Sequence, residues 1–116
     1  MKYKFKEENT FDQRLADSKR IKLKYPERIP VIVEKNPNTH IADIDKHKFL
    51  VPADITVAQF LWIIRKRIDL SAEKALFLFI GKSMPQSSAT MGQLYEDFKD
   101  DDGFLYAGYS GENSFG

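Results

Sequence analysis

A helix-start signal occurs three times in this chain of 116 residues, and each copy is a threonine followed three residues later by a glutamine. The pairs are Thr10 with Gln13, Thr56 with Gln59, and Thr90 with Gln93. In such a capping box the threonine oxygen accepts a hydrogen bond from an amide of the first helical turn, and the glutamine reaches back to the amide of the capping residue. The three boxes therefore predict three helices, with any strands confined to the segments around them.

Apolar periodicity supports these helices to different degrees. The segment after Thr56 has the strongest pattern, and cations stand near its end, where they suit the helix dipole. Its apolar positions are Val57, Phe60, Leu61, Ile64 and Ile68, and those after Thr90 are Met91, Leu94, Tyr95 and Phe98. The helix after Thr10 is less amphipathic and should end at Tyr25, because a proline follows. We expect this helix to pack onto an otherwise complete domain.

Four short segments rich in β-branched or aromatic residues predict strands. They cover residues 28–35, 48–51, 75–80 and 104–109. Pro30 and Pro52 predict that at least one of the first two strands lies at a sheet edge, because proline cannot donate a ladder hydrogen bond. Alternation along the first strand places Ile32 on the outward face, where an apolar side chain requires a partner.

Composition restricts the class of protein further. The chain contains no cysteine, which excludes a disulfide framework, a thiolate nucleophile and a cysteine metal site, and favours a reducing compartment. Its length suits one globular domain, and no segment has the apolar length of a signal peptide core or of a membrane-spanning helix. We therefore expect a soluble, cytosolic polypeptide.

The net charge is only +1, although basic residues gather near the start and acidic residues near the end. Acidic residues interrupt the basic segment, so a solvated helix face is favoured over a site for nucleic acid or anionic lipid. His40 and His47 stand in a polar segment without a neighbouring acid and nucleophile, which indicates exposed histidines rather than a catalytic or metal site. The sequence predicts no catalytic residue, cofactor or metal.

Several stretches closely resemble the autophagy-related protein 8 family, which includes the GABA-receptor-associated proteins. They are residues 25–35 (YPERIPVIVEK), 48–52 (KFLVP), 64–68 (IRKRI), 103–106 (GFLY) and 109–116 (YSGENSFG). The resemblance covers essentially the whole chain. It implies an α+β fold, a ubiquitin-like β-grasp with a four-stranded mixed sheet and an N-terminal helical extension. The expected organisation is a helical extension over residues 1–25, the β-grasp domain over 26–110 and a flexible conjugation tail over 111–116.

The same resemblance implies a ubiquitin-like modifier of autophagosome formation rather than an enzyme. In this family an activating enzyme and a conjugating enzyme carry the terminal glycine as a thioester, which becomes amide-linked to phosphatidylethanolamine. Gly116 holds that position here. Further expected partners are a cysteine protease for processing or delipidation, and cargo receptors and adaptors with short linear motifs. The expected location is the cytoplasm, and autophagosome or related vesicle membranes after lipidation.

Family members bind short peptides with an aromatic residue, two variable residues and an aliphatic one, which add as a strand to the sheet edge. By motif matching, the backbone of residues 48–51 should pair with the peptide, and two pockets should take its alternate side chains. The aromatic pocket is expected to comprise Asp17, Ile21, Pro30, Ile32, Lys48, Leu50 and Phe104. The aliphatic pocket is expected to comprise Phe49, Val51, Pro52, Ile55, Phe60 and Ile63. Arg28, Lys46 and Arg67 are expected to contact acidic residues that flank the peptide.

Some interpretations stay open. Without the resemblance, the regular spacing of Leu50, Phe60 and Phe104 would favour plain core positions, and core and pocket roles can coexist. Phe77 and Phe79 fit either a second docking surface known in the family or the core of a strand. An unconjugated cytosolic trafficking adaptor that binds the same peptides is the alternative function, and a ubiquitin-like tag for proteins is less favoured by the resemblance.

Overall fold

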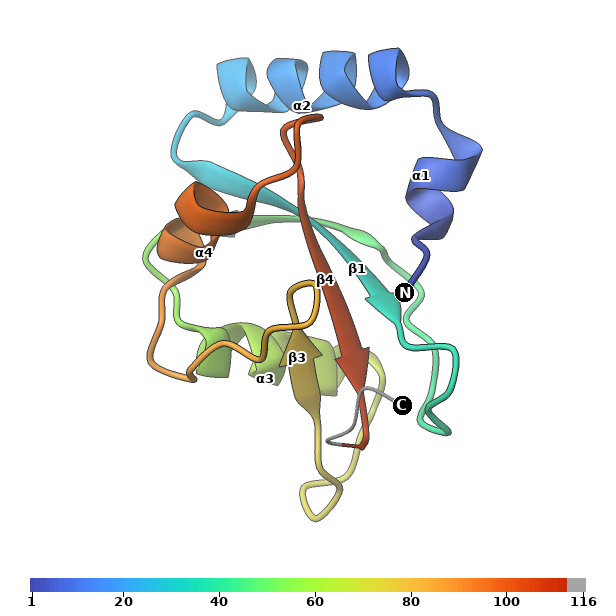
Figure 1. Cartoon of the computed structure of the whole chain (residues 1–116). Coiled ribbons are helices and arrows are strands. Elements are labelled where there is room, and N and C mark those ends of the chain that lie inside the picture. The colour runs from blue at the N-terminus through green and yellow to red at the C-terminus, as the bar shows by residue number, and fades with distance from the viewer. Residues whose placement is uncertain (113–116) are drawn as a thin grey trace.

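The computed structural model describes residues 1–112, which contain four helices and four strands. In chain order they are α1 (Lys4–Glu8), α2 (Phe11–Lys24), β1 (Arg28–Lys35), β2 (Lys48–Pro52), α3 (Val57–Arg67), β3 (Phe77–Phe79), α4 (Met91–Phe98) and β4 (Leu105–Ser110). α1 and α2 lie on one side of the sheet and α3 lies on the other (Figure 1). α1 is the one helix among these that the sequence patterns did not predict.

Each predicted capping threonine stands at the N-cap of a helix. Thr10 begins α2 and Thr56 begins α3 with complete capping boxes, because both halves of the reciprocal hydrogen bonding are present. Thr90 accepts a hydrogen bond from the amide of Gln93 at the start of α4, but the Gln93 side chain donates to Asp97 instead (3.1 Å). The prediction of a third complete box is therefore wrong, because the Gln93 side chain does not bond the Thr90 amide.

The four strands form one mixed sheet in the order β2-β1-β4-β3. β1 pairs antiparallel with β2 and parallel with β4, and β4 pairs antiparallel with β3. The first strand has its predicted bounds, whereas β3 is three residues long because the chain turns at Gly81 (φ 60°) and Ile80 bridges Ser83 instead. β4 begins at Leu105, one residue later than predicted.

Both prolines occupy positions where the ladder requires no donor. The Val33 amide donates to the His47 carbonyl oxygen (2.7 Å), which sets the alternation of hydrogen-bonded and non-bonded pairs between β1 and β2. Pro30 and Pro52 both belong to the non-bonded pairs of that register. β2 also ends the sheet order, which confirms the prediction that a proline-bearing strand lies at an edge.

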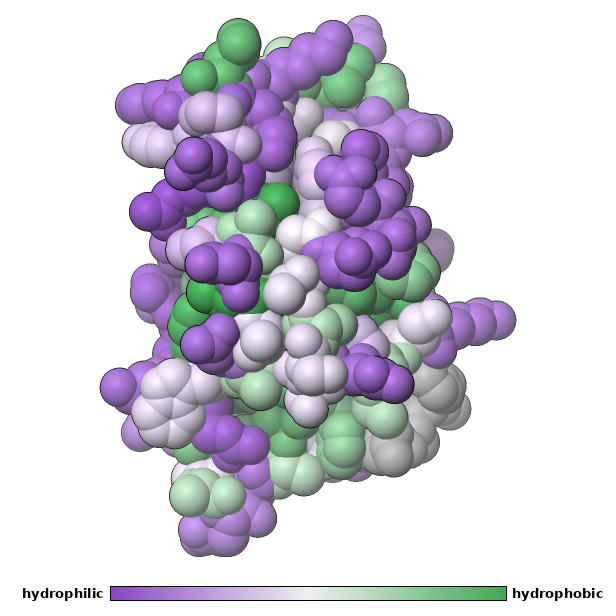
Figure 2. Space-filling view, turned by 90° about the vertical axis from the view of Figure 1, so that its left-hand side faces the viewer, coloured by the Kyte–Doolittle hydropathy of each residue, from purple (hydrophilic) through white to green (hydrophobic). Residues whose placement is uncertain are grey.

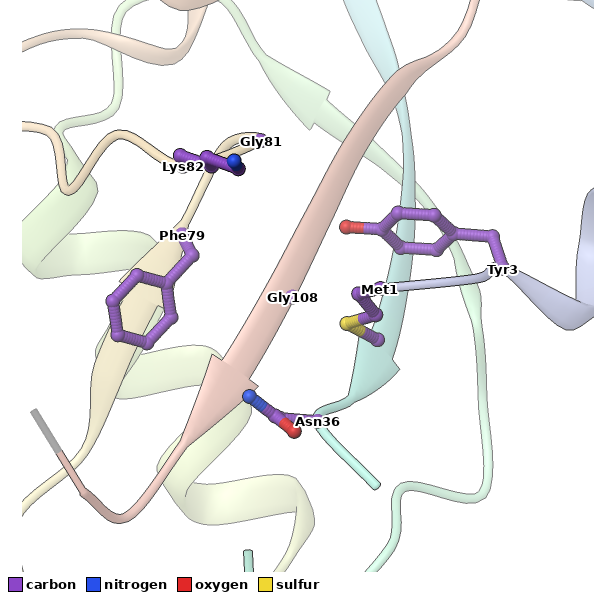
Figure 3. A pocket seen from close by; sticks show the side chains of 7 residues that line it. All are labelled: Met1, Tyr3, Asn36, Phe79, Gly81, Lys82 and Gly108. Carbon is purple, nitrogen blue, oxygen red and sulfur yellow. The ribbon is translucent and has the colours of Figure 1, made fainter. Parts of the chain in front are cut away.

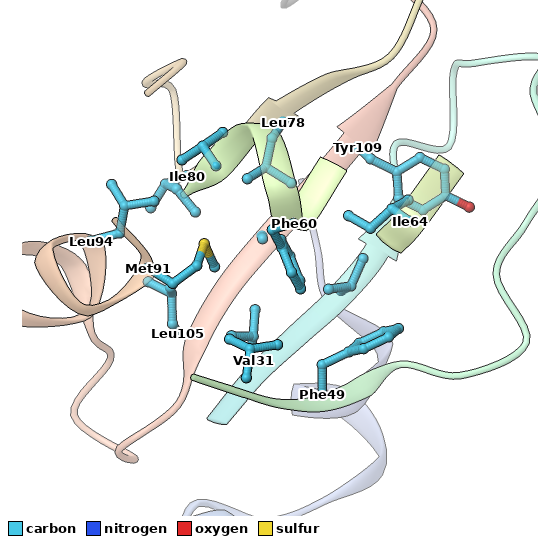
Figure 4. Packing of buried hydrophobic residues seen from close by; sticks show 14 of the residues in the cluster. Val31, Phe49, Phe60, Ile64, Leu78, Ile80, Met91, Leu94, Leu105 and Tyr109 are labelled. Atoms are coloured by element: carbon cyan, nitrogen blue, oxygen red, sulfur yellow. The ribbon is translucent and has the colours of Figure 1, made fainter. Parts of the chain in front are cut away.

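The main hydrophobic core lies between the sheet and α3. Phe60 and Ile64 project from α3 toward the sheet, where Val31 stands on β1, and all three side chains are fully buried (Figure 4). Leu78 from β3 and Met91 from α4 belong to the same cluster. The apolar periodicity after Thr56 and Thr90 thus marks the faces that these two helices turn inward.

A second, smaller cluster covers the opposite face of the sheet. Ile32 points into it and is fully buried, as is Phe104, and Ile21 of α2 is buried beside them. Two aromatic side chains of the N-terminal segment pack on its surface, with ring centroids 5.0 Å apart for Tyr3 and Tyr106 and 5.2 Å apart for Phe5 and Phe104. The partner that Ile32 requires is therefore the chain's own helical extension.

Hydrogen bonds and ion pairs of charged groups connect this extension to β1 and to the segment before β4. The Glu34 carboxylate of β1, itself buried, accepts hydrogen bonds from the backbone amides of Lys4 (2.8 Å) and Phe5 (3.0 Å) at the start of α1. Lys6 pairs with Asp100 (2.7 Å), and Arg14 pairs with the fully buried Asp102 (2.8 Å). These contacts connect both N-terminal helices to residues far away in the sequence.

Alkaline pH is expected to destabilise this side of the molecule. Burial raises the pKa of Tyr3 and of Tyr106 above the ordinary value of 10.0, and the nearby carboxylates of Glu34 and Asp102 act in the same direction. Because the folded pKa exceeds the unfolded one, the stabilisation is complete below pH of about 10 and is lost as pH rises toward the folded pKa values. Urea unfolding at increasing pH should show this loss. Tyr106→Phe should make the decline shallower, and an unchanged slope would contradict the assignment.

The surface of the extension is mainly hydrophilic. The side of the molecule in Figure 2 shows hydrophobic side chains scattered among hydrophilic ones, and α2 exposes Lys19 and Arg20 to solvent. Arg20 forms an ion pair with Asp17 on the same helix, so part of the positive charge of α2 is neutralised by a neighbouring carboxylate. Within residues 1–112, no helix combines the length and apolar character needed to cross a bilayer.

Candidate functional site

β2 exposes one edge of its backbone, because it is the terminal strand of the sheet. The alternation set by the Val33 and His47 hydrogen bond directs the N–H and C=O groups of Lys48 and Leu50 away from β1. The Leu50 carbonyl oxygen accepts a hydrogen bond from Arg28 Nη1 (3.0 Å). An extended peptide that pairs with Leu50 would therefore compete with the Arg28 side chain or share this oxygen with it.

The side chains of β2 alternate between the two faces of the sheet. Phe49 and Val51 are buried in the main core, on the side of α3. Lys48 and Leu50 are half-buried, and Leu50 packs on the second cluster, beneath the N-terminal helices. Lys48 and Leu50 of the predicted aromatic pocket thus lie on one face of the edge strand, and Phe49 and Val51 of the predicted aliphatic pocket lie on the other. Pro52, at the exposed end of β2, has the parity of Lys48 and Leu50 although it was predicted for the aliphatic pocket.

On the side of the N-terminal helices, two residues of the predicted aromatic pocket form an ion pair. Asp17 of α2 accepts a hydrogen bond from Lys48 Nζ (2.5 Å), and that nitrogen also lies 5.7 Å from the centroid of the Phe5 ring. Pro30, Ile21, Ile32 and Phe104 are buried beneath these groups. The predicted set is brought together, with Leu50 and Lys48 accessible and the remaining apolar residues forming the interior.

The residues predicted for the aliphatic pocket divide into a buried and an exposed group. Phe49, Val51 and Phe60 are buried, and the rings of Phe49 and Phe60 meet edge to face at a centroid distance of 5.8 Å. Pro52 and Ile63 are exposed, and Ile55 is half-buried against the main core. A ligand could touch Pro52, Ile55 and Ile63 in this conformation, while the buried aromatic rings form the layer behind them.

The three predicted cationic residues lie close to β2 or to the segment that leads into it. Arg28 contacts Leu50, and Lys46 Nζ lies 5.0 Å from the centroid of the Phe49 ring. Arg67 at the end of α3 pairs with Asp45 (3.0 Å), and this hydrogen bond lowers the pKa of the exposed Asp45 carboxyl. Sequence reasoning missed Asp45 as a partner of Arg67, because the pair joins a helix end to a distant loop.

A separate cavity of about 350 Å³ lies near the N-terminus, at β3 and β4 (Figure 3). Its lining residues are Met1, Tyr3, Asn36, Phe79, Gly81, Lys82 and Gly108. Phe77 is half-buried and Phe79 is buried, with Phe79 lining the cavity. These positions are compatible with both interpretations of the two phenylalanines, which therefore stay open.

The segment after β4 begins at Gly111, whose amide donates to Thr39 Oγ1 (2.9 Å). Gly116, the predicted conjugation residue, lies outside the described residues, and its role stays a prediction. His40 and His47 are exposed, and His47 Nδ1 lies 2.9 Å from the Val33 carbonyl oxygen. In the described part of the chain, no three histidine, aspartate or glutamate side chains gather as metal ligands.

A mixed four-stranded sheet with a helix packed across one face defines a ubiquitin-like protein, and the helical extension covers the other face. A family model described as autophagy protein Atg8, ubiquitin like, matches residues 13–116. The crystal structure of Trypanosoma brucei ATG8 superimposes with a TM-score of 0.93 at 45% sequence identity, covering 100% of both chains. The ubiquitin-like fold predicted from the resemblance is thereby confirmed.

Two further relatives match along nearly their whole length. Autophagy-related protein 8 of Coccidioides immitis is 57% identical over 116 residues, which cover 100% of this chain and 99% of the relative. Autophagy-related protein 8b of Arabidopsis thaliana is 55% identical over 115 residues, which cover 99% of this chain and 94% of the relative. The chain belongs to the Atg8 family of ubiquitin-like autophagy proteins.

Proposed function

We propose that this protein is a modifier that becomes linked through Gly116 to phosphatidylethanolamine and recruits proteins carrying aromatic-x-x-aliphatic peptides. The exposed edge of β2 is the observation that carries the recruiting role, because its outward N–H and C=O groups suit an added strand. For this function we expect the protein in the cytoplasm and, after lipidation, on autophagosome or related vesicle membranes. Cargo receptors and adaptors with short linear motifs are the corresponding partners.

The peptide's side chains would alternate between the two sides of β2. An aromatic residue would contact Leu50 and Lys48 on the side of α2, and an aliphatic residue would contact Ile55 and Ile63 on the side of α3, next to Pro52 at the end of β2. The exposed cations Arg28, Lys46 and Arg67 would attract acidic residues beside the motif, so affinity should fall as salt screens these charges.

Glycine at the conjugation position has a physical reason. Without a side chain, its carboxylate can enter a narrow active site and adopt backbone angles closed to other residues. Transfer would proceed from an activating enzyme to a conjugating enzyme as a thioester, and then to the lipid amine with release of the enzyme thiol. The two acyl chains of the lipid, at about 0.8 kcal/mol per buried methylene, would hold the protein on a bilayer.

A conjugation assay tests this function. The protein is incubated with ATP, an activating enzyme and a conjugating enzyme of the family, and liposomes containing phosphatidylethanolamine, and its intact mass is measured. We expect a mass increase of one lipid for the wild type and none for Gly116→Ala, with unchanged thermal stability of the variant.

The enzymes are validated beforehand on a family member known to be lipidated. If that member reacts and this protein gains no lipid, the conjugation proposal is wrong and the unconjugated trafficking adaptor becomes the better account. Addition of a family cysteine protease to the lipidated product should restore the original mass, which tests the expected delipidation.

A further inference from the structure

The loop of residues 36–47, between β1 and β2, holds the end of β4 and the start of the tail. The Asn36 amide donates to the Tyr109 carbonyl oxygen (2.8 Å), and Asn36 lies beside β4 in Figure 3. The hydroxyl of the fully buried Tyr109 donates to the Ala42 carbonyl oxygen (2.7 Å). The Gly111 amide then donates to Thr39 Oγ1 (2.9 Å). The loop therefore contacts the chain at the end of β4 and at the start of the tail.

Thr39 is the central residue of this contact. It is buried, although it stands in a loop with exposed neighbours, and its hydroxyl oxygen accepts the hydrogen bond from the Gly111 amide. While Oγ1 accepts from Gly111, hydrogen bonds from the Thr39 and Ser110 hydroxyls, with the charge of nearby His40, hold the pKa of the Glu112 carboxyl below its usual value. Ser110 Oγ also accepts from the Glu112 amide (3.1 Å).

Gly111 permits the close approach of loop and tail. A Cβ atom at this position would lie 2.9 Å from Ile41 Cγ2 and 3.3 Å from Thr39 Oγ1. A contact of 2.9 Å is closer than carbon atoms tolerate, so a side chain at residue 111 would require the Ile41 side chain or the tail to shift. Two features thus permit the hydrogen bond between tail and loop: residue 111 has no side chain, and residue 39 carries a hydroxyl.

We propose that Thr39 is a positioning residue for conjugation, which holds Gly111 so that the tail leaves the domain at a fixed point and in a fixed direction. This inference rests on the proposed conjugation through Gly116. The five residues after Gly111 can span at most about 18 Å, so the anchor at Gly111 determines where the terminal carboxylate can reach. Ordering residues before the enzyme binds reduces the entropy lost in the complex.

The consequence is a specific kinetic effect on the activating enzyme. Thr39→Val keeps the shape of the side chain and removes the hydroxyl, so the tail loses its anchor while the fold stays intact. We expect KM for thioester formation to rise on the order of tenfold with kcat unchanged, because the chemistry at the glycine is the same once the tail is bound. Thr39→Ser retains the hydroxyl and should restore most of the wild-type KM.

Two more variants complete the test. Gly111→Ala should also raise KM, because its methyl group would displace the tail from Ile41. This variant keeps the hydroxyl of residue 39, so it tests the position of the tail independently of that group. Asn38→Ala, at an exposed position in the same loop, is the matched control and should leave KM unchanged. Thermal melting verifies that each variant is folded, and peptide affinity at β2 should be equal in all of them.

The outcomes separate this inference from the proposed function. A wild-type KM for Thr39→Val, or an equal rise for Thr39→Val and Thr39→Ser, would overturn the positioning role while wild-type lipidation still supports the modifier. A fall in kcat with unchanged KM would also overturn it. If the wild type forms no thioester and no lipid adduct with validated enzymes, the proposed function is wrong and this inference falls with it.

Discussion

Leu50→Ala is expected to weaken binding of an aromatic-x-x-aliphatic peptide by about 30- to 1000-fold, which corresponds to about 2–4 kcal/mol at an interface hot spot. Leu50 combines two properties that suit it to this role. Its half-buried side chain packs on the second cluster, and its backbone N–H and C=O groups face the open edge of β2. The truncation removes apolar contact area and leaves backbone pairing intact. Fluorescence anisotropy of a labelled peptide measures the change.

Leu23→Ala is the matched control for this experiment, because it makes the same chemical change on α2 at a side chain that is 86% exposed. Its peptide affinity should stay within about twofold of the wild type, since exposed substitutions away from a site have small effects. Equal affinities for the Leu50 and Leu23 variants would show that the aromatic pocket is wrongly placed. Phe104→Ala is a weaker test, because truncating this fully buried ring should itself destabilise the fold by about 3–5 kcal/mol.

Asp102→Ala should lower the free energy of unfolding by about 3–5 kcal/mol, as expected when one partner of a buried ion pair is removed. The Asp102 carboxylate is fully buried and accepts hydrogen bonds from Arg14 Nε (2.8 Å), the Tyr106 hydroxyl (2.5 Å) and the Phe104 amide (2.9 Å). Its removal leaves a largely buried guanidinium without its carboxylate and two further donors unpaired. Urea denaturation followed by circular dichroism measures the loss.

Asp101→Ala provides the comparison, since it deletes the same carboxylate at the adjacent, exposed position. Its free energy of unfolding should change by no more than about 0.5 kcal/mol. The pair of variants separates the buried contact from the general loss of negative charge in residues 100–102. Equal effects of the two substitutions would refute the anchoring role of Asp102.

Much of the fold could be predicted because its signals are local. Thr10 and Thr56 specify their helix starts within four residues, and the alternation in β1 marks its faces. α1 could not be predicted in this way, because it is five residues long and none of its side chains is more than partly buried. Its start is stabilised by Glu34, which is 30 positions from Lys4 along the chain, and no local pattern reports such a contact.

The candidate site was predictable only in part, for a related reason. The period of two along β2 separates Leu50 from Phe49, and Pro52 indicates an edge. The family resemblance supplied the remaining residues of the two pockets. The core position that spacing favoured for Phe60 is confirmed by its complete burial, but neither pattern nor resemblance predicts that Asp17 binds Lys48, because that contact depends on how separate elements pack.

Because β4 is the last strand in the chain, the domain can complete its folding only late in synthesis. β4 follows the other three strands in the chain, yet it lies inside the sheet, with Val31 of β1 opposite Leu105 on one side and β3 on the other. Pairing between such distant segments forms slowly, and it cannot begin before the ribosome has released residues 105–110. Nascent chains should therefore expose the apolar surfaces of β1 and α3 until β4 has been synthesised.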